Sequence, residues 1–191
     1  MILVTGFEPF TTGQGLVLTH NPTADIATRV AERIEGVESA VLPVSFQDTK
    51  KSLTAHFERL KPSAWLGMGY APHRTTLDIE TIALNLEHAE TGDNDGDTPW
   101  MRPIVKDAPL AYRTRLDERR AIEVFATHGV EAKAAIHAGA FLCNQSFFLG
   151  CHFAETSEFL KLAGFIHVPP MSDFGGFEEG LSALLREFAA A

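Results

Sequence analysis

The chain has 191 residues and a formal net charge of −9, from 16 lysines and arginines against 25 aspartates and glutamates. Hydrophobic residues make up 45% and charged residues 21%, as in an ordinary globular protein, so we expect one domain over 1–191. The acidic balance disfavours nucleic acid or an anionic membrane as the main partner, and no apolar run approaches the ~20 residues needed to cross a bilayer.

Short apolar segments alternate along the chain with amphipathic stretches of helical spacing. In chain order, the sequence predicts a strand at 2–7, a helix at 21–34, a strand at 40–44, a helix at 49–60, a strand at 64–69, a strand or strand pair at 77–86, a helix at 117–129, a strand at 132–139, a helix at 143–155, a strand at 164–169 and a helix at 177–188. This alternation favours an α/β fold, with a largely parallel twisted sheet and helices on both faces.

Two segments, 8–21 and 87–115, have the character of long loops, which are often functional in a compact domain. Within the second, the run Asp93–Asp97 looks like a calcium-binding loop. The EF-hand register fails, however, because it places Thr91 and Arg102 at the first and last ligand positions. We therefore predict a turn there and no metal site.

The spacing of the glycines and cysteines argues against several further kinds of site. Gly13 and Gly15 lack the third glycine of a dinucleotide-binding loop and do not directly follow a strand, so such a site is poorly supported. Cys143 and Cys151 do not form a disulfide framework, and their separation misses the close pairing of zinc ligands. Two free thiols indicate a reducing, cytoplasmic setting.

Cys143 stands at a position where this fold class places chemistry. It follows strand 132–139 at the start of helix 143–155, and ligands of open α/β sheets bind beyond the carboxyl ends of the strands. A helix N-terminus would favour the reactive thiolate, and its free N–H groups could hold an oxyanion. His167 lies in strand 164–169, and a neighbouring strand end would bring its imidazole near the thiol.

Glu80 is the third candidate, because Ile79 and Ile82 flank it and a buried carboxylate needs a partner. Orienting a histidine would supply one. Each residue also has a plainer interpretation when taken alone. A buried cysteine is usually an inert small hydrophobe, His167 is one of eight histidines, and a lone glutamate in a strand more often faces solvent.

Six stretches occur in an order and spacing that match a known family along nearly the whole chain. They are GFEPF at 6–10, NPT at 21–23, GYAPHRTTLDIETIALN at 69–85, PIVKDAPLAY at 103–112, AGAFLCN at 138–144 and GFIHVP at 164–169. No single stretch is specific, but together they resemble pyroglutamyl peptidase I, the pyrrolidone-carboxylate peptidases.

This resemblance implies a cysteine peptidase that hydrolyses the amide bond after an N-terminal pyroglutamyl residue of peptides. It assigns Cys143 as nucleophile, His167 as base and Glu80 as third member of the triad, with a thioester intermediate. It also implies a cofactor-free enzyme with a three-layer α/β/α sandwich that assembles into a homotetramer.

The resemblance places Phe10 against the lactam ring of the substrate, and Tyr70 and Arg74 become further candidates for substrate binding. The lactam is flat and uncharged, so its pocket should be small and mainly apolar. We further hypothesise that loop 8–20 closes over pyroglutamate and carries Phe10, because Gly13 and Gly15 lie in it.

The chain also departs from the family pattern. Tyr70 stands where bacterial members often carry glutamine, and Thr81 follows Glu80 where the family has arginine. At 89–94 the chain reads AETGDN, and Glu90 replaces an arginine expected to help at the oxyanion. Arg74 is retained and could compensate. Two alternatives therefore stay open: a catalytically weakened relative that binds N-terminal pyroglutamate or a related lactam, and a cysteine amidase acting on a related small amide.

Overall fold

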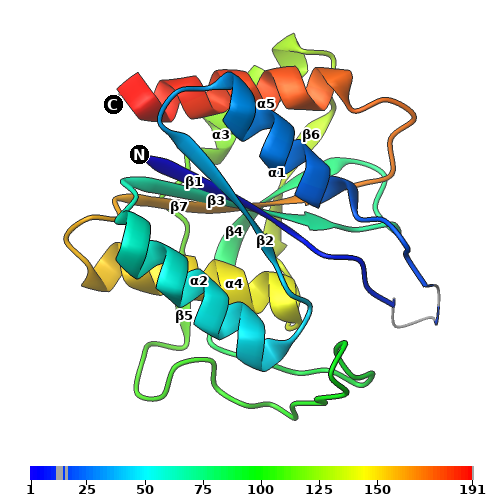
Figure 1. Cartoon of the computed structure of the whole chain (residues 1–191), viewed down its shortest axis with the longest axis vertical. Helices are drawn as coiled ribbons and strands as arrows, with labels where there is room; N and C mark the ends of the chain where they lie inside the picture. Colours follow the sequence, from blue (N-terminus) through cyan, green and yellow to red (C-terminus); the bar gives the residue numbers. More distant parts are fainter. Residues whose placement is uncertain (12–14, 16, 191) are drawn as a thin grey trace.

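The computed structural model describes residues 1–11, 15 and 17–190. A central sheet carries helices α1, α3 and α5 on one face and α2 and α4 on the other (Figure 1), so the predicted three-layer α/β/α fold is confirmed. The elements are β1 (Ile2–Phe7), α1 (Pro22–Arg33), β2 (Val37–Leu42), α2 (Phe46–Leu60), β3 (Ala64–Tyr70), β4 (Leu77–Leu84), β5 (Ala111–Arg113), α3 (Glu118–Thr127), β6 (Ala132–His137), α4 (Leu142–Thr156), β7 (Leu162–Val168) and α5 (Gly175–Ala190).

The sheet is mostly parallel, with a reversed part at one side. Its order is β2-β1-β3-β7-β4-β5, and β6 also pairs with β4. Strands β2, β1, β3 and β7 are parallel neighbours, whereas β4 runs antiparallel to β7 and parallel to β6. Because Ile79 pairs with both β6 and β7, strand β4 separates these two strands.

The winding of the chain changes direction next to β1. Helix α1 follows β1 on one face of the sheet, whereas α2 precedes β3 on the other face, and β1 and β3 are neighbours (Figure 1). Such a switch leaves a crevice beyond the carboxyl ends of the strands, which is where open α/β sheets bind their ligands. A ligand site is therefore expected at this edge of the sheet.

Local capping explains one difference from the predicted boundaries. Helix α2 begins at Phe46, three residues before the predicted start at 49, because the Ser45 hydroxyl accepts a hydrogen bond of 3.2 Å from the Asp48 N–H. Helix α1 begins as predicted, since the Asn21 side chain accepts from the Thr23 N–H at 3.2 Å and Pro22 opens the helix.

One strand differs from the prediction in another way. Strand β5 lies inside 87–115, which was predicted to be a loop, and pairs antiparallel with the end of β4. Of the two alternatives predicted at 77–86, a strand or a strand pair, the structure shows the single strand.

The core has two halves, one under each layer of helices. The first half joins α1, α3 and α5 to the sheet, and Phe125 stacks on Phe177 at 5.5 Å between ring centroids within it. The second half joins α2 and α4 and is rich in aromatic rings around the fully buried Trp65. Among the helices of the described residues, none is long and apolar enough to cross a membrane.

Candidate active site

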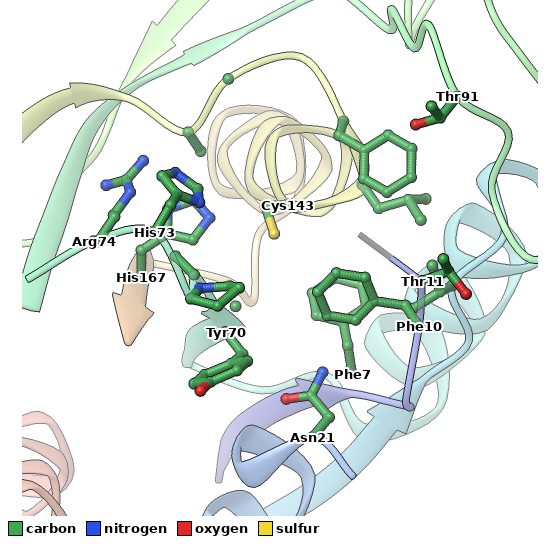
Figure 2. Close-up of a pocket in the computed structure, with 18 of the residues that line it drawn as sticks. Phe7, Phe10, Thr11, Asn21, Tyr70, His73, Arg74, Thr91, Cys143 and His167 are labelled. Atoms are coloured by element: carbon green, nitrogen blue, oxygen red, sulfur yellow. The ribbon is translucent and has the colours of Figure 1, made fainter. Parts of the chain in front are cut away.

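A cavity of about 650 Å³ opens at the carboxyl ends of β1, β3 and β7. One part of its wall is apolar and the other part is polar (Figure 2). Its lining comprises Phe7, Phe10, Thr11, Asn21, Val44, Gly69, Tyr70, Ala71, Pro72, His73, Arg74, Thr91, His137, Ala138, Gly139, Phe141, Leu142, Cys143 and His167.

Cys143 occupies the first turn of α4, and its sulfur points into this cavity (Figure 2). Phe141 forms the N-cap of the helix and provides no side-chain hydrogen bond to the first turn. Free N–H groups of a first helical turn can stabilise a negative charge beside the thiol. The expected location of Cys143 at a helix start therefore matches the structure.

Gly69 of β3 makes room for the sulfur. A methyl group in place of its hydrogen would lie 2.6 Å from Cys143 Sγ and 3.2 Å from His167 Cδ2. The thiol and the imidazole thus share the space over this glycine, because Gly69 pairs with His167 across β3 and β7.

His167 and Glu80 form a buried pair at the wall of the cavity. The Glu80 Oε1 atom lies 2.6 Å from His167 Nδ1, and the two residues are 0% and 6% exposed. Arg74 Nη1 donates to the same carboxylate oxygen at 2.8 Å and also contacts Asp78. Since Nδ1 is occupied by Glu80, the other ring nitrogen, Nε2, is left for the cavity.

Burial decides the resting protonation of both reactive groups. It raises the pKa of the Cys143 thiol to about 12, and the negative charge of Glu80 acts in the same direction. The Arg74 charge and the backbone N–H of Cys143 oppose this rise. Burial also lowers the pKa of His167, against the hydrogen bond that its ring donates to Glu80. For Cys143, the backbone N–H at the helix start lowers the pKa in the direction expected from the sequence, but burial has the larger effect.

The three triad candidates meet by a different route from the one expected. We expected the strand before Cys143 and the strand of His167 to be neighbours, but β4 lies between β6 and β7 and runs antiparallel to β7. Strand β4 instead places Glu80 beside His167, and α4 brings Cys143 back over β3 and β7. The structure therefore brings Cys143 and His167 to one cavity, and Glu80 is buried in contact with His167.

The substrate-binding candidates Phe10, Tyr70 and Arg74 also line this cavity. The Arg74 guanidinium is directed at Glu80 and Asp78. Its charge therefore acts on the cavity mainly through its contact with Glu80. Phe10 is fixed at the base of the loop, because its carbonyl accepts from the Leu18 N–H at 2.9 Å. Of the loop hypothesised to close over the ligand, residues 12–14 and 16, with Gly13 among them, lie outside the described residues.

Glu90, the departure from the family pattern, is exposed and does not line the cavity. The neighbouring Thr91 does line it (Figure 2). The negative charge that replaces the expected arginine therefore lies away from the reacting groups. The predicted turn at Asp93 is confirmed, because its carboxylate accepts hydrogen bonds from the N–H groups of Phe46, Asp95 and Asp97.

Sequence reasoning missed two histidines of the cavity wall. His73 and His137 are both exposed and line the cavity near Cys143. His73 directly precedes Arg74 in the stretch 69–85, which resembles the family. Its position beside a candidate residue could therefore have identified it from the sequence. His137 ends β6, and its place at the cavity depends on the chain's path through Gly139, which has a positive φ of 81°.

Comparison with known proteins agrees with this geometry. A family model described as pyroglutamyl peptidase matches residues 1–178. The chain is 36% identical over 175 residues to the pyrrolidone-carboxylate peptidase of Thermococcus litoralis, covering 90% of this chain and 77% of the relative. It is also 36% identical over 175 residues to the enzyme of the same name from Pyrococcus furiosus, covering 88% and 80%.

Solved structures give the same result for the fold. The crystal structure of pyrrolidone carboxyl peptidase from Pyrococcus furiosus superposes with a TM-score of 0.88 at 30% sequence identity, over 99% of this chain and 98% of that chain. The family resemblance found in the sequence motifs is therefore confirmed.

Proposed function

The chain belongs to the pyroglutamyl peptidase family, and from that premise we propose that it hydrolyses the amide bond after an N-terminal pyroglutamyl residue of peptides. The observation that carries this proposal is the 2.6 Å contact between Glu80 and His167 at the wall of the cavity into which Cys143 points. A thiol, an imidazole and an orienting carboxylate are the parts of a cysteine peptidase.

In the proposed mechanism, proton transfer and attack occur together. His167 Nε2 takes the proton from Cys143 Sγ as the sulfur attacks the pyroglutamyl carbonyl carbon. Backbone N–H groups at the start of α4 stabilise the oxyanion of the tetrahedral intermediate. Glu80 holds the imidazole in its reactive tautomer and stabilises its positive charge.

Collapse of the intermediate breaks the amide bond. The imidazolium of His167 donates its proton to the leaving amine, and the pyroglutamyl group remains on Cys143 as a thioester. Water, activated by the now neutral His167, then attacks the thioester carbonyl. This second step releases pyroglutamate and returns the proton to the sulfur of Cys143.

The apolar part of the cavity suits the lactam ring. Phe7, Phe10, Val44, Phe141 and Leu142 supply apolar surface beside the thiol. Backbone groups near Phe10 and Tyr70 are the candidates for pairing the lactam N–H and C=O. Such pairing would discriminate against proline, which lacks the carbonyl and would leave a buried donor unpaired.

Two alternatives remain testable beside this proposal. A relative that binds a lactam without cleaving it was motivated by Glu90, and the position of Glu90 outside the cavity lining weakens that motive. A cysteine amidase acting on a related small amide would use the same triad but a different pocket chemistry.

The deciding experiment measures hydrolysis of a fluorogenic pyroglutamyl amide. We expect turnover by the wild type and a loss of roughly 10³-fold or more in Cys143→Ala and Cys143→Ser. Absence of thiol-dependent turnover, with pyroglutamate still bound, would favour the binding protein. Faster cleavage of prolyl or other small amides would favour the amidase.

We also propose that the protein works in a reducing, cytoplasmic setting as a homotetramer. The free thiols of Cys143 and Cys151 support the setting. Large apolar side chains that stay exposed in the single chain, such as Trp100 at 77% and Leu110 at 88%, support association between copies. Light scattering after size exclusion gives the mass in solution, and a monomeric mass would refute the tetramer.

A further inference from the structure

A second cavity of about 270 Å³ lies beside the first and shares Tyr70 with it. The remaining apolar part of its wall consists of Leu18, Pro22, Met171 and Phe174. It lies on the α1 and α5 side of the sheet, whereas Cys143 belongs to α4 on the opposite side. The two cavities therefore flank the carboxyl edge of the sheet at the winding switch.

Three chain segments connect the two cavities. Asn21 lines the first cavity, and the next residue, Pro22, lines the second. His167 lines the first, and Met171, four residues later, lines the second. With Tyr70 common to both walls, the two cavities adjoin in the crevice beyond the ends of β1, β3 and β7.

The proposed reaction fixes the direction in which a substrate lies in this crevice. His167 must reach the leaving nitrogen, so the leaving peptide lies on the His167 side of the thiol and the lactam lies toward Phe7 and Phe10. Figure 2 shows Tyr70 on the His167 side, with its ring directed away from Cys143. The leaving peptide thus starts at the wall that the second cavity shares.

We infer that the second cavity binds the second residue after pyroglutamate, while the first residue after it lies across Tyr70. This inference rests on the proposed peptidase function. An extended peptide advances about 3.3–3.6 Å per residue, so one residue passes over the tyrosine ring before the next side chain enters.

The chemistry of the cavity favours an apolar side chain at that position. The polar groups of its wall already have partners: Arg29 lies 2.6 Å from Glu178, and His20 Nε2 lies 3.5 Å from Asp25. The apolar wall of Met171 and Phe174 then gives the main contact with the peptide. The protein should therefore distinguish peptides by the size of the second residue after pyroglutamate.

Three substrates test this: pyroglutamyl-alanine amide, pyroglutamyl-alanyl-glycine amide and pyroglutamyl-alanyl-leucine amide. For the wild type we expect kcat/KM on the leucine peptide to exceed that on the glycine peptide by roughly tenfold, because leucine buries apolar surface. In Met171→Ala, and in the double variant that also carries Phe174→Ala, this ratio should fall to about two, with unchanged turnover of pyroglutamyl-alanine amide.

Ile122→Ala is the matched control, because Ile122 packs against the same half of the core and lines neither cavity. Thermal unfolding verifies that each variant is folded, and Met171→Ala alone carries the test if the double variant is not. The inference would be overturned if the wild type and the variants showed the same ratio between the leucine and glycine peptides. It would also be overturned if the wild type did not distinguish these two peptides. A wild type inactive on all three substrates would instead refute the proposed peptidase function.

Discussion

At the scale of single residues, one carboxylate oxygen of Glu80 contacts both Arg74 and His167. The Oε1 atom of Glu80 accepts from Arg74 at 2.8 Å and lies 2.6 Å from His167 Nδ1. Burial has the largest effect on His167 and lowers its pKa; the hydrogen bond and charge of Glu80 raise this pKa, and Arg74 lowers it further. Because the proposed general base must be neutral, burial and these opposing charges together should determine the pH below which activity is lost.

We predict that Glu80→Gln and Arg74→Gln move the acid limb of the kcat/KM profile in opposite directions. Loss of the carboxylate charge lowers the pKa of His167, so the limb moves to lower pH. Loss of the guanidinium charge raises this pKa, so the limb moves to higher pH. The plateau should fall roughly 10²–10⁴-fold in Glu80→Gln, because a glutamine holds the wrong imidazole tautomer.

The profiles are measured from pH 4 to 9 with a fluorogenic pyroglutamyl amide. Arg33→Gln serves as the control for removal of an arginine charge, since Arg33 of α1 pairs with Glu178 of α5 rather than with the triad. Limbs that move in the same direction in the two triad variants would contradict the assigned charges.

At the scale of elements, three segments hold the turn that leads to Phe10. The Asn94 side-chain amide donates to Glu8 Oε1 at 3.1 Å and to the Pro9 carbonyl at 3.2 Å. Glu8 Oε1 also accepts from the Val44 N–H at 2.9 Å, and the Glu8 carbonyl accepts from the Asn21 amide at 3.1 Å. The segment 87–110 thereby fixes the N-terminal wall of the cavity without touching the thiol.

Asn94→Ala should accordingly raise KM for a pyroglutamyl amide by about three- to tenfold with little change in kcat. Two hydrogen bonds are lost, each worth about 1 kcal/mol, and Phe10 becomes less well placed against the lactam. Asp95→Ala is the control, because its exposed side chain lies in the same turn. Steady-state kinetics separate the two constants, and a fall confined to kcat would argue against a positioning role.

The elements also show how far the sequence alone can predict this molecule. Strand β1 and strand β3 were predicted nearly to the residue, because each is a continuous apolar run in a parallel sheet. Strand β5 has only three residues, and its pairing with distant β4 defines it, so no local pattern marked it. The insertion of β4 between β6 and β7 depends on the same kind of long-range pairing.

The site divides in a similar way. The family motifs indicated Cys143, His167 and Glu80; the structure places Cys143 and His167 at one cavity and Glu80 in contact with His167. Sequence reasoning expected a thiolate at Cys143 because a helix start is visible in the sequence, whereas the burial that raises its pKa is a tertiary property. His137 lies at the wall through a chain path that no local pattern specifies, whereas the adjacency of His73 to Arg74 could have identified His73 from the sequence.

At the scale of the whole molecule, the second half of the core encloses α4 almost completely. Ten of the fifteen residues of this helix are buried, from Leu142 to Ala154. Cys151 is one of them, at 3% exposure, whereas Cys143 lies in the first turn of the helix, at the cavity. The thiol proposed as the nucleophile thus belongs to a helix whose other thiol is part of the core.

Because Cys151 is buried, the free energy of unfolding should fall at alkaline pH. Burial raises the pKa of Cys151 from 9.0 to about 12, so above pH 9 the unfolded chain releases a proton that the folded chain keeps. The contribution of Cys151 is full below pH 9 and is lost progressively as the pH rises toward 12, by about 1.4 kcal/mol per pH unit. We predict that from pH 9 to 11 the free energy of unfolding falls less steeply in Cys151→Ala than in the wild type, by this slope. Urea unfolding at each pH measures it, and parallel curves for the two proteins would show that the Cys151 thiol does not stay protonated in the folded state.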